Sequence, residues 1–314
     1  MLRAIVLGIV QGITEFLPIS SSAHLSIVPR LLGYATPTLA FEVLLHFGTL
    51  AAVVAYFARD LWAFVLCLVA PGRLGPGEAA TRRRLLGLLA LASVPAAVVG
   101  FLLQDWADEQ TARPLRASVW LVLTTVIMIA AELYARSRPP GAAPAVAPGE
   151  LEGGAEEVPA ARAGTRVQRH HGRATGTATD AEDTQRELQR LPVLKAAGIG
   201  LGQALALIPG TSRSGITISA GLFLGVSRET AARFSFLLSI PAILGAGILK
   251  LDELSTATET PAELAAGTIA AAVSGFLAVS FLIRLLRTRT LWPFIWYRLA
   301  AGGLFVLLLS TIRS

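Results

Sequence analysis

Cysteine, histidine and charged residues are all scarce in this chain of 314 residues. Its one cysteine, Cys67, excludes an intramolecular disulfide, and with only four histidines the sequence offers no cluster typical of a Cys/His metal site. Charged residues make up 15% of the chain, whereas soluble domains carry about 25%. This shortage of charge argues against an ordinary soluble fold.

The positive charge of the chain does not indicate a nucleic-acid partner. The formal net charge is +6, but the basic residues are concentrated in short loops beside apolar blocks. That placement is typical of the cytoplasmic loops of membrane proteins, where lysine and arginine are enriched. We therefore expect a lipid bilayer, and no nucleic acid, as the partner of these basic residues.

Long apolar runs are abundant, and the mean hydropathy is +0.62. A helix needs about 20 apolar residues to cross the hydrocarbon core of a bilayer. Six segments are long enough, namely 38–57, 85–103, 117–135, 230–249, 261–283 and 291–312. The sequence therefore predicts an all-α polytopic membrane protein.

Two further apolar stretches, 4–33 and 194–226, are each interrupted by proline and polar residues. The first break runs from Glu15 to Ser20 and the second from Ile208 to Gly215. Each flanking half extends roughly 20 Å at 1.5 Å per residue, which is too short to span a membrane. We expect two re-entrant helical hairpins, because irregular backbone at that depth is tolerated only inside protein or beside a wet cavity.

The two hairpins divide the chain into similar halves. Residues 1–135 and residues 191–314 each contain one broken hairpin followed by three spans. Because three is odd, the second half should be inverted relative to the first, an arrangement known from membrane proteins with broken helices. Segment 136–190 is rich in proline, glycine and charge, and is predicted to be a disordered cytoplasmic linker.

The arginines indicate an orientation in the membrane. Segments 58–84 and 284–290 are rich in arginine, and the alternation of spans places both on the same side as segment 136–190. This side is expected to be cytoplasmic. Both termini and the first hairpin would then face outward, and the second hairpin would enter from the cytoplasm.

Polar side chains gather at both breaks, where burial in a membrane is costly and usually functional. The first hairpin carries Gln11, Thr14, Glu15, Ser20, Ser21, Ser22 and His24, and the second carries Gly210, Thr211, Ser212, Arg213 and Ser214. Gln11 and Glu15 are four residues apart and should share a helix face. A helix N-terminus with an arginine beside it suits phosphate. If the tips meet, a carboxylate and hydroxyls would face a phosphate cradle.

Each of these features also has a structural interpretation. Serine-rich turns usually cap helices. Glu42 and His46 are four residues apart within one span and could pair to hold helices together. Glu132, Glu263 and Arg298 lie near the ends of spans and are expected at the membrane interface.

Two motifs are similar to the signatures of one bacterial family. Residues 8–25 (GIVQGITEFLPISSSAHL) and residues 209–215 (PGTSRSG) resemble those of the undecaprenyl-pyrophosphate phosphatases, the bacitracin-resistance family. Shorter similar stretches are 41–43, 225–228 and 293–298. The sequence departs from many members at Gln11, where glutamate is common, and at Ala23, where glycine is common.

The resemblance implies hydrolysis of the C55 lipid undecaprenyl pyrophosphate to its monophosphate in the bacterial cell membrane, which recycles the lipid carrier of cell-wall synthesis. The candidate catalytic residues are Glu15, Ser21, His24 and Arg213, with Ser21 as nucleophile and His24 as its base or as the leaving-group acid. The candidate substrate-binding residues are Gln11, Thr14, Ser20, Ser22, Gly210, Thr211, Ser212 and Ser214.

Several alternatives stay open. A water molecule activated by Glu15 or His24 could replace Ser21 as the nucleophile. Glu15 with Gln11 could hold a divalent cation, Mg²⁺ or Ca²⁺. Inverted repeats are also typical of transporters, so the chain could flip a lipid phosphate, with or without hydrolysis. A homodimer is a further open alternative.

Overall fold

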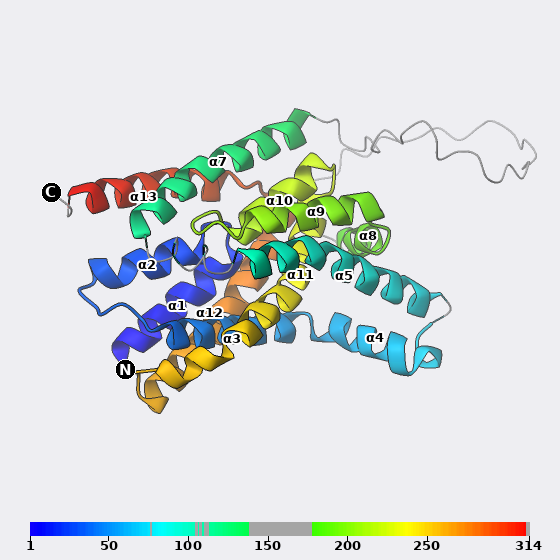
Figure 1. The fold of residues 1–314 in the computed structure, drawn as a ribbon. Helices are drawn as coiled ribbons and strands as arrows, with labels where there is room; N and C mark the ends of the chain where they lie inside the picture. The colour runs from blue at the N-terminus through cyan, green and yellow to red at the C-terminus, as the bar shows by residue number, and fades with distance from the viewer. Residues whose placement is uncertain (76, 104–105, 107–108, 110–112, 138–177, 312–314) are drawn as a thin grey trace, which may run out of the picture.

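A computed structural model describes the chain except for residues 76, 104–105, 107–108, 110–112, 138–177 and 312–314 (Figure 1). Every regular element in the described residues is helical. The first half contains α1 (Leu2–Phe16), α2 (Ser21–Leu31), α3 (Leu39–Tyr56), α4 (Ala58–Val69), the 3-10 turn η1 (Pro71–Arg73), α5 (Glu78–Leu102) and α7 (Pro114–Ser137). The second half contains α8 (Ala178–Gln189), α9 (Val193–Leu205), α10 (Arg213–Phe223), α11 (Arg228–Leu249), the 3-10 turn η2 (Leu251–Thr256), α12 (Pro261–Thr288) and α13 (Trp292–Thr311).

Six of the described helices, α3, α5, α7, α11, α12 and α13, are long and apolar enough to cross a bilayer. They correspond to the six expected spans, so the chain is built as a multi-pass membrane protein. The observed α5 begins at Glu78 rather than at residue 85, and α12 continues to Thr288 rather than ending at 283. The extra turns carry arginines, because hydropathy marks only the apolar part of a helix while its backbone hydrogen bonds continue beyond it.

Both expected hairpins consist of two short helices separated by an irregular segment. α1 ends at Phe16 and α2 begins at Ser21, and the second pair breaks between Leu205 and Arg213. α2 and α10 have 11 residues each, or about 17 Å of helix, which is shorter than the hydrocarbon core. The structure contains one chain, so the homodimer alternative stays a prediction.

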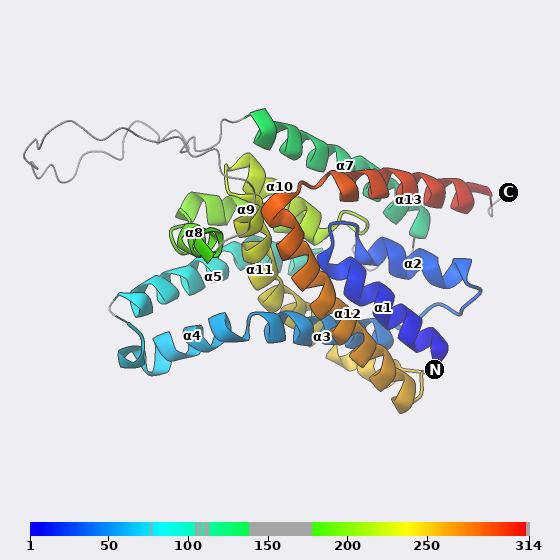
Figure 2. The same cartoon turned by 180° about the vertical axis from the view of Figure 1, so that it is seen from behind.

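The helices cross one another around a central apolar core. α1 lies against α12, α12 packs on α3, and α5 packs on α9. The view from behind shows α1 and α12 side by side (Figure 2). α7 and α13 form a pair along one edge (Figure 1). The start of α1 and the end of α13 lie at one end of the molecule, while α4 and the start of α5 lie at the other.

Small residues allow α1 and α12 to approach closely. A Cβ atom added to Gly8 would lie 2.2 Å from the carbonyl oxygen of Gly267, and one added to Gly12 would lie 2.0 Å from Ser274 Oγ. Such residues let helix backbones come together in membranes. The contact fixes the helix that leads into the first break against a long span.

The predicted disordered linker 136–190 lies only partly within the described residues, and there the prediction is wrong. Residues 138–177 are outside them, but the segment ends in helix α8, on which Leu188 is buried. Glu187 on α8 accepts hydrogen bonds from the main-chain N–H and the hydroxyl of Ser227. Tertiary contacts of this kind stabilise a helix whose polar composition resembles that of a linker.

The segment 58–84, expected to be a loop, is also largely helical. α4 buries Ala63, Phe64 and Cys67 along one face, although it is too short to be recognised as a span. Arg82 on α5 pairs with Asp60 on α4 at 2.7 Å. The arginines of this segment are therefore attached to helices rather than to an irregular loop.

Replacing Gly8 with alanine should destabilise the protein, because the added methyl group collides with the Gly267 backbone. Overpacking of this kind costs about 1–3 kcal/mol. Gly303→Ala on α13 is the matched control, since its Cβ meets nothing within 4 Å and the change should stabilise the helix by up to ~1 kcal/mol. Thermal unfolding in detergent would measure both, and equal midpoints would contradict the close packing.

Candidate active site

An ion pair joins the two broken hairpins. Nη2 of Arg213, the first residue of α10, donates to Oε1 of Glu15 on α1 at 2.8 Å. The side chains are 15% and 8% exposed, respectively. Two of the residues predicted to be catalytic, from opposite halves of the chain, therefore meet directly in the interior.

The second oxygen of Glu15 is bonded to the first hairpin itself. Glu15 Oε2 accepts a hydrogen bond from Ser21 Oγ at 2.6 Å and one from Gln11 Nε2 at 3.2 Å. Gln11 and Glu15 thus share a helix face, as their spacing predicts. The carboxylate holds a serine hydroxyl on one side and a guanidinium on the other.

The two breaks also exchange hydrogen bonds with each other. The N–H of Gly210 donates to Ser22 Oγ at 3.1 Å, and Ser214 Oγ donates to the carbonyl oxygen of Leu17 at 3.2 Å. Gly210 has φ +93°, and an added Cβ would lie 2.0 Å from the carbonyl oxygen of Ala117. Only glycine suits this position, because its backbone is left-handed and lies directly against α7.

Ser20 and Ser212 occupy equivalent places before α2 and α10. Their φ angles are 73° and 71°, which residues other than glycine rarely adopt. Each side chain caps its helix: Ser20 Oγ accepts from the N–H of Ala23, and Ser212 Oγ accepts from the N–H of Gly215. The capping interpretation of the serine-rich turns is confirmed at both sites, beside the ion pair.

The ring of His24 is directed toward α13. Nδ1 donates to the carbonyl oxygen of Ser20 at 2.7 Å, so in the neutral ring Nε2 accepts from the hydroxyl of Tyr297, also at 2.7 Å. Both nitrogens are therefore engaged away from Ser21 in this conformation. Thr14 is likewise bonded within its own helix, to the carbonyl oxygen of Val10 at 2.7 Å.

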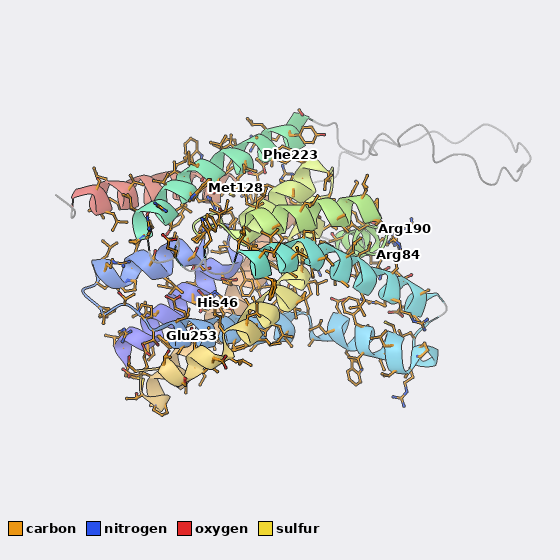
Figure 3. All side chains as sticks on the ribbon, in the orientation of Figure 1. His46, Arg84, Met128, Arg190, Phe223 and Glu253 are labelled. Carbon is orange, nitrogen blue, oxygen red and sulfur yellow. The ribbon has the colours of Figure 1, made fainter. Side chains whose placement is uncertain are left out.

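A cavity of about 240 Å³ adjoins the ion pair and includes Arg213, Glu42, His46 and Lys250 in its lining. Figure 3 labels His46 on α3. Its Nδ1 donates to the main-chain carbonyl oxygen of Glu42, and its Nε2 lies 3.7 Å from Glu15 Oε2. His46 thus contacts the Glu42 backbone, and its ring turns toward the ion pair.

Comparison with known proteins identifies the family. The family described as bacitracin resistance protein BacA matches residues 4–304. The chain belongs to the BacA family. The resemblance of residues 8–25 and 209–215 to that family is thereby confirmed.

Several relatives are similar over nearly their whole length, and each bears the name undecaprenyl-diphosphatase. The relative from Pelobacter propionicus is 39% identical over 99% of this chain and 98% of its own. Those from Geobacter sulfurreducens and Alcanivorax borkumensis are 40% and 42% identical, each over 96% of both chains.

Arg298 of this BacA family member is fully buried, as is Glu132. The expectation that both lie at the membrane interface, from their places near span ends, is therefore wrong. The Arg298 guanidinium donates to the carbonyl oxygens of Thr211 at 3.2 Å and Pro18 at 3.4 Å, one in each break. It also donates to Leu121, Thr124 and Thr125 of α7. An arginine inside a predicted span was the available signal, since charges there are rare and usually functional.

Glu132, expected at the interface like Arg298, is instead paired inside the protein. Its carboxylate accepts hydrogen bonds from Arg228 at 2.5 Å and from the N–H of Leu291 at 3.3 Å. The contact links α7 to the starts of α11 and α13. Glu263 lies in the first turn of α12, where it forms a capping box with Thr260, and its expected place at the membrane interface stays a prediction.

Oxygen ligands for a hard cation are present beside the ion pair. Besides the Glu15 carboxylate, Gln11 Oε1 is buried and has no hydrogen-bond partner within the described part of the chain. Mg²⁺ and Ca²⁺ prefer such carboxylate and amide oxygens. Among the described residues no three His, Cys, Asp or Glu side chains gather into one group. These residues fit a divalent cation that takes its remaining ligands from phosphates.

Replacing Arg298 with alanine should destabilise the fold. The carbonyl oxygen of Pro18 would lose its donor and that of Thr211 would keep only the hydroxyl of Thr124 at 3.3 Å, and an unpaired buried group costs about 1–3 kcal/mol. We expect the midpoint of thermal unfolding in detergent to fall by roughly 5–10 °C. Arg289→Ala is the control because Arg289 is exposed, and a similar fall in both variants would contradict the clamping role of Arg298.

Proposed function

We propose that this chain is an undecaprenyl-diphosphatase, which hydrolyses undecaprenyl pyrophosphate to undecaprenyl phosphate and phosphate. This reaction would recycle the lipid carrier of cell-wall synthesis in the bacterial cell membrane. The observation that carries the proposal is the meeting of Glu15, Ser21 and Arg213 at one point between apolar helices. The names of the relatives support the choice of substrate.

The two halves of the chain are, in this proposal, inverted repeats with re-entrant hairpins. Ser20 and Ser212 share a rare backbone conformation and cap the following helix. Two residues further on, the hydroxyls of Ser22 and Ser214 each bond to the opposite break. Each half continues with three of the long apolar helices. These parallels support a repeated structural unit. Because each unit has an odd number of spans, the second would have the opposite orientation in the membrane.

The site would open to the outside of the cell. Its cavity is lined by Leu39, Glu42 and His46 from the first turns of α3 and by residues up to Lys250 at the end of α11. The arginine-rich segment 58–84 follows α3, so it lies at the end of that helix away from the cavity. Segment 284–290 lies at the end of α12, whose start follows the end of α11, so it too lies away from the cavity. Arginine enrichment favours the cytoplasmic side, which leaves the cavity and both termini outside.

Arg213 and the start of α10 would bind the diphosphate. One nitrogen of Arg213 is bonded to Glu15, and Nη1 has no partner among the described residues. A guanidinium can bind phosphate oxygens in a bidentate manner, and the free N–H groups at a helix N-terminus favour anions. These donors would stabilise charge that spreads over the transferred phosphoryl group. Ser212, Ser214 and Thr211 would hold this anion-binding turn in shape.

Ser21 is the proposed nucleophile. Its Oγ would attack the terminal phosphorus, the bond from that phosphorus to the bridging oxygen would break, and undecaprenyl phosphate would leave. Because Ser21 donates to Glu15 Oε2 at 2.6 Å, Glu15 is placed to accept the hydroxyl proton. Water would then hydrolyse the phosphoserine. Direct attack by water activated by Glu15 is the alternative.

The same phosphoryl-transfer step would also depend on residues that position its reacting groups, namely Ser20, Ser22, His24 and Gly210. His24 donates from Nδ1 to the carbonyl oxygen of Ser20 and accepts at Nε2 from Tyr297. To act as a leaving-group acid, the ring would first take up a proton at Nε2 and then donate it to the substrate in place of its contact with Tyr297. Ser22 and Gly210 keep the two breaks in register. Thr14, bonded to its own helix, would bind substrate only after a rotamer change.

A divalent cation would be held by Glu15 and Gln11 Oε1 together with the substrate. When bound, Mg²⁺ or Ca²⁺ would neutralise phosphate charge as a Lewis acid. Gln11 itself supplies a neutral oxygen and keeps its amide N–H on Glu15.

Glu15→Gln, Ser21→Ala and Arg213→Ala should each lower phosphate release from undecaprenyl pyrophosphate by purified protein at least ~100-fold in kcat. Ser26→Ala is the control, because within the described residues its hydroxyl bonds only the carbonyl oxygen of Ala23 on the same helix, and it should stay within about two-fold. EDTA should abolish wild-type release if the cation is required. An active Ser21→Ala protein would favour water as the nucleophile. A wild type that transports the lipid across the membrane but releases no phosphate would contradict the proposed hydrolysis.

The outward orientation predicts which side of the membrane a thiol probe can reach. In a Cys67→Ala background, Lys250→Cys, in the cavity lining at the end of α11, should react with an impermeant maleimide added outside intact cells. Arg73→Cys on the exposed turn η1 should react only after the cells are opened. The reverse pattern would invert the proposed topology.

A further inference from the structure

A second cavity, of about 700 Å³, adjoins the first at Arg213. It lies between α5, α9 and α11. Four residues line both cavities, namely Arg213, Ala242, Ala246 and Lys250. The two spaces are therefore neighbours that meet at a pair of cationic side chains.

Apart from its two cations and the polar residues Ser93 and Gln203, the lining of this larger cavity is apolar. α5 contributes Ala97 and Phe101, the second break contributes Leu207, and α11 contributes Gly245 and Ile248. A volume of this size is typical of pockets that bury a sizeable ligand, which usually lie between helices or domains. Its apolar lining suits a branched hydrocarbon, and its two cationic side chains suit an anion attached to that hydrocarbon.

We propose that this cavity binds the isoprenoid units nearest the diphosphate of the substrate. The inference rests on the proposed function and names the subsite that recognises the lipid. In a prenyl diphosphate the hydrocarbon begins at the first phosphate oxygen. A prenyl-binding space must therefore adjoin the cations that hold the phosphates, and this cavity shares Arg213 and Lys250 with the headgroup cavity.

A larger apolar groove competes for the same role on size alone. It measures about 890 Å³ and runs between α1 and α12, where Ile5, Ile9 and Val273 contribute to its lining. Among the described residues, none that lines this groove is charged and none is shared with the headgroup cavity. A chain covalently bound to the diphosphate has no continuous path into it along those linings, so we assign the prenyl units to the cavity beside Arg213.

Two glycines in the lining offer room for an added Cβ atom. A Cβ added to Gly245 would meet nothing within 4 Å, and one added to Gly100 would lie 3.8 Å from the side chain of Leu207. Both glycines line the cavity, on α11 and α5 respectively. Gly245→Phe and Gly100→Leu would therefore place side chains in the proposed prenyl space from two independent helices.

The test compares phosphate release from isopentenyl, farnesyl and undecaprenyl diphosphates. For Gly245→Phe and Gly100→Leu we expect KM for the farnesyl and undecaprenyl substrates to rise at least tenfold, with kcat nearly unchanged. KM for isopentenyl diphosphate, which has a single isoprenoid unit, should stay within two-fold. Val273→Phe, in the competing groove, should change none of the three.

Two outcomes would overturn the assignment. One is a rise in KM for the longer substrates in Val273→Phe but not in the two glycine variants. The other is an equal loss of activity on all three substrates in both glycine variants, since that would place the effect at the headgroup. In either case phosphate release by the wild type would leave the proposed hydrolysis intact. A wild type that releases no phosphate from any substrate would instead refute the proposed function itself.

Discussion

A carboxylate and a guanidinium from positions 198 residues apart in the chain meet inside this protein at 2.8 Å. Taking two charges out of water costs several kcal/mol per ion and is offset only where the geometry is good and the remaining polar atoms are bonded. Ser21 and Gln11 meet that requirement for Glu15. Arg213 keeps one nitrogen without a partner among the described residues, so the pair retains donor capacity for an anion.

The same constraint extends to the backbone around the ion pair. Each break interrupts a helix in apolar surroundings, where unpaired carbonyl and N–H groups are expensive. The reciprocal bonds of Ser22 and Ser214 satisfy some of these groups, and Arg298 satisfies others by bonding carbonyl oxygens in both breaks. The polar groups that hold the breaks together therefore also hold Glu15 and Arg213 at bonding distance.

The position of Arg213 also relates the site to an amphipathic substrate. Arg213 lines both a small cavity with Glu42 and His46 and a larger, mainly apolar one. A lipid diphosphate has the same division, with its charge at one end of a hydrocarbon. One cation at the boundary can bind the phosphates while the two spaces separate headgroup from chain, which is consistent with the membership of the chain in the BacA family.

Sequence patterns determined the features that depend on local composition. Apolar runs long enough to cross a bilayer marked the six long helices, and polar interruptions marked both breaks. Helical spacing placed Gln11 beside Glu15. The signatures at residues 8–25 and 209–215 identified the family, because those motifs are long and occur in the family's order.

Only the tertiary structure decided which polar groups became partners. Arg298 lies near the end of a span in the sequence, yet crossing helices bury it between the two breaks. His24 follows Ser21 by one helical turn, yet its ring bonds Tyr297 on α13. Helix α8 forms from a segment with the composition of a linker, since Glu187 docks it on α11. Composition and periodicity report the environment along one helix, whereas these contacts depend on how separate helices cross.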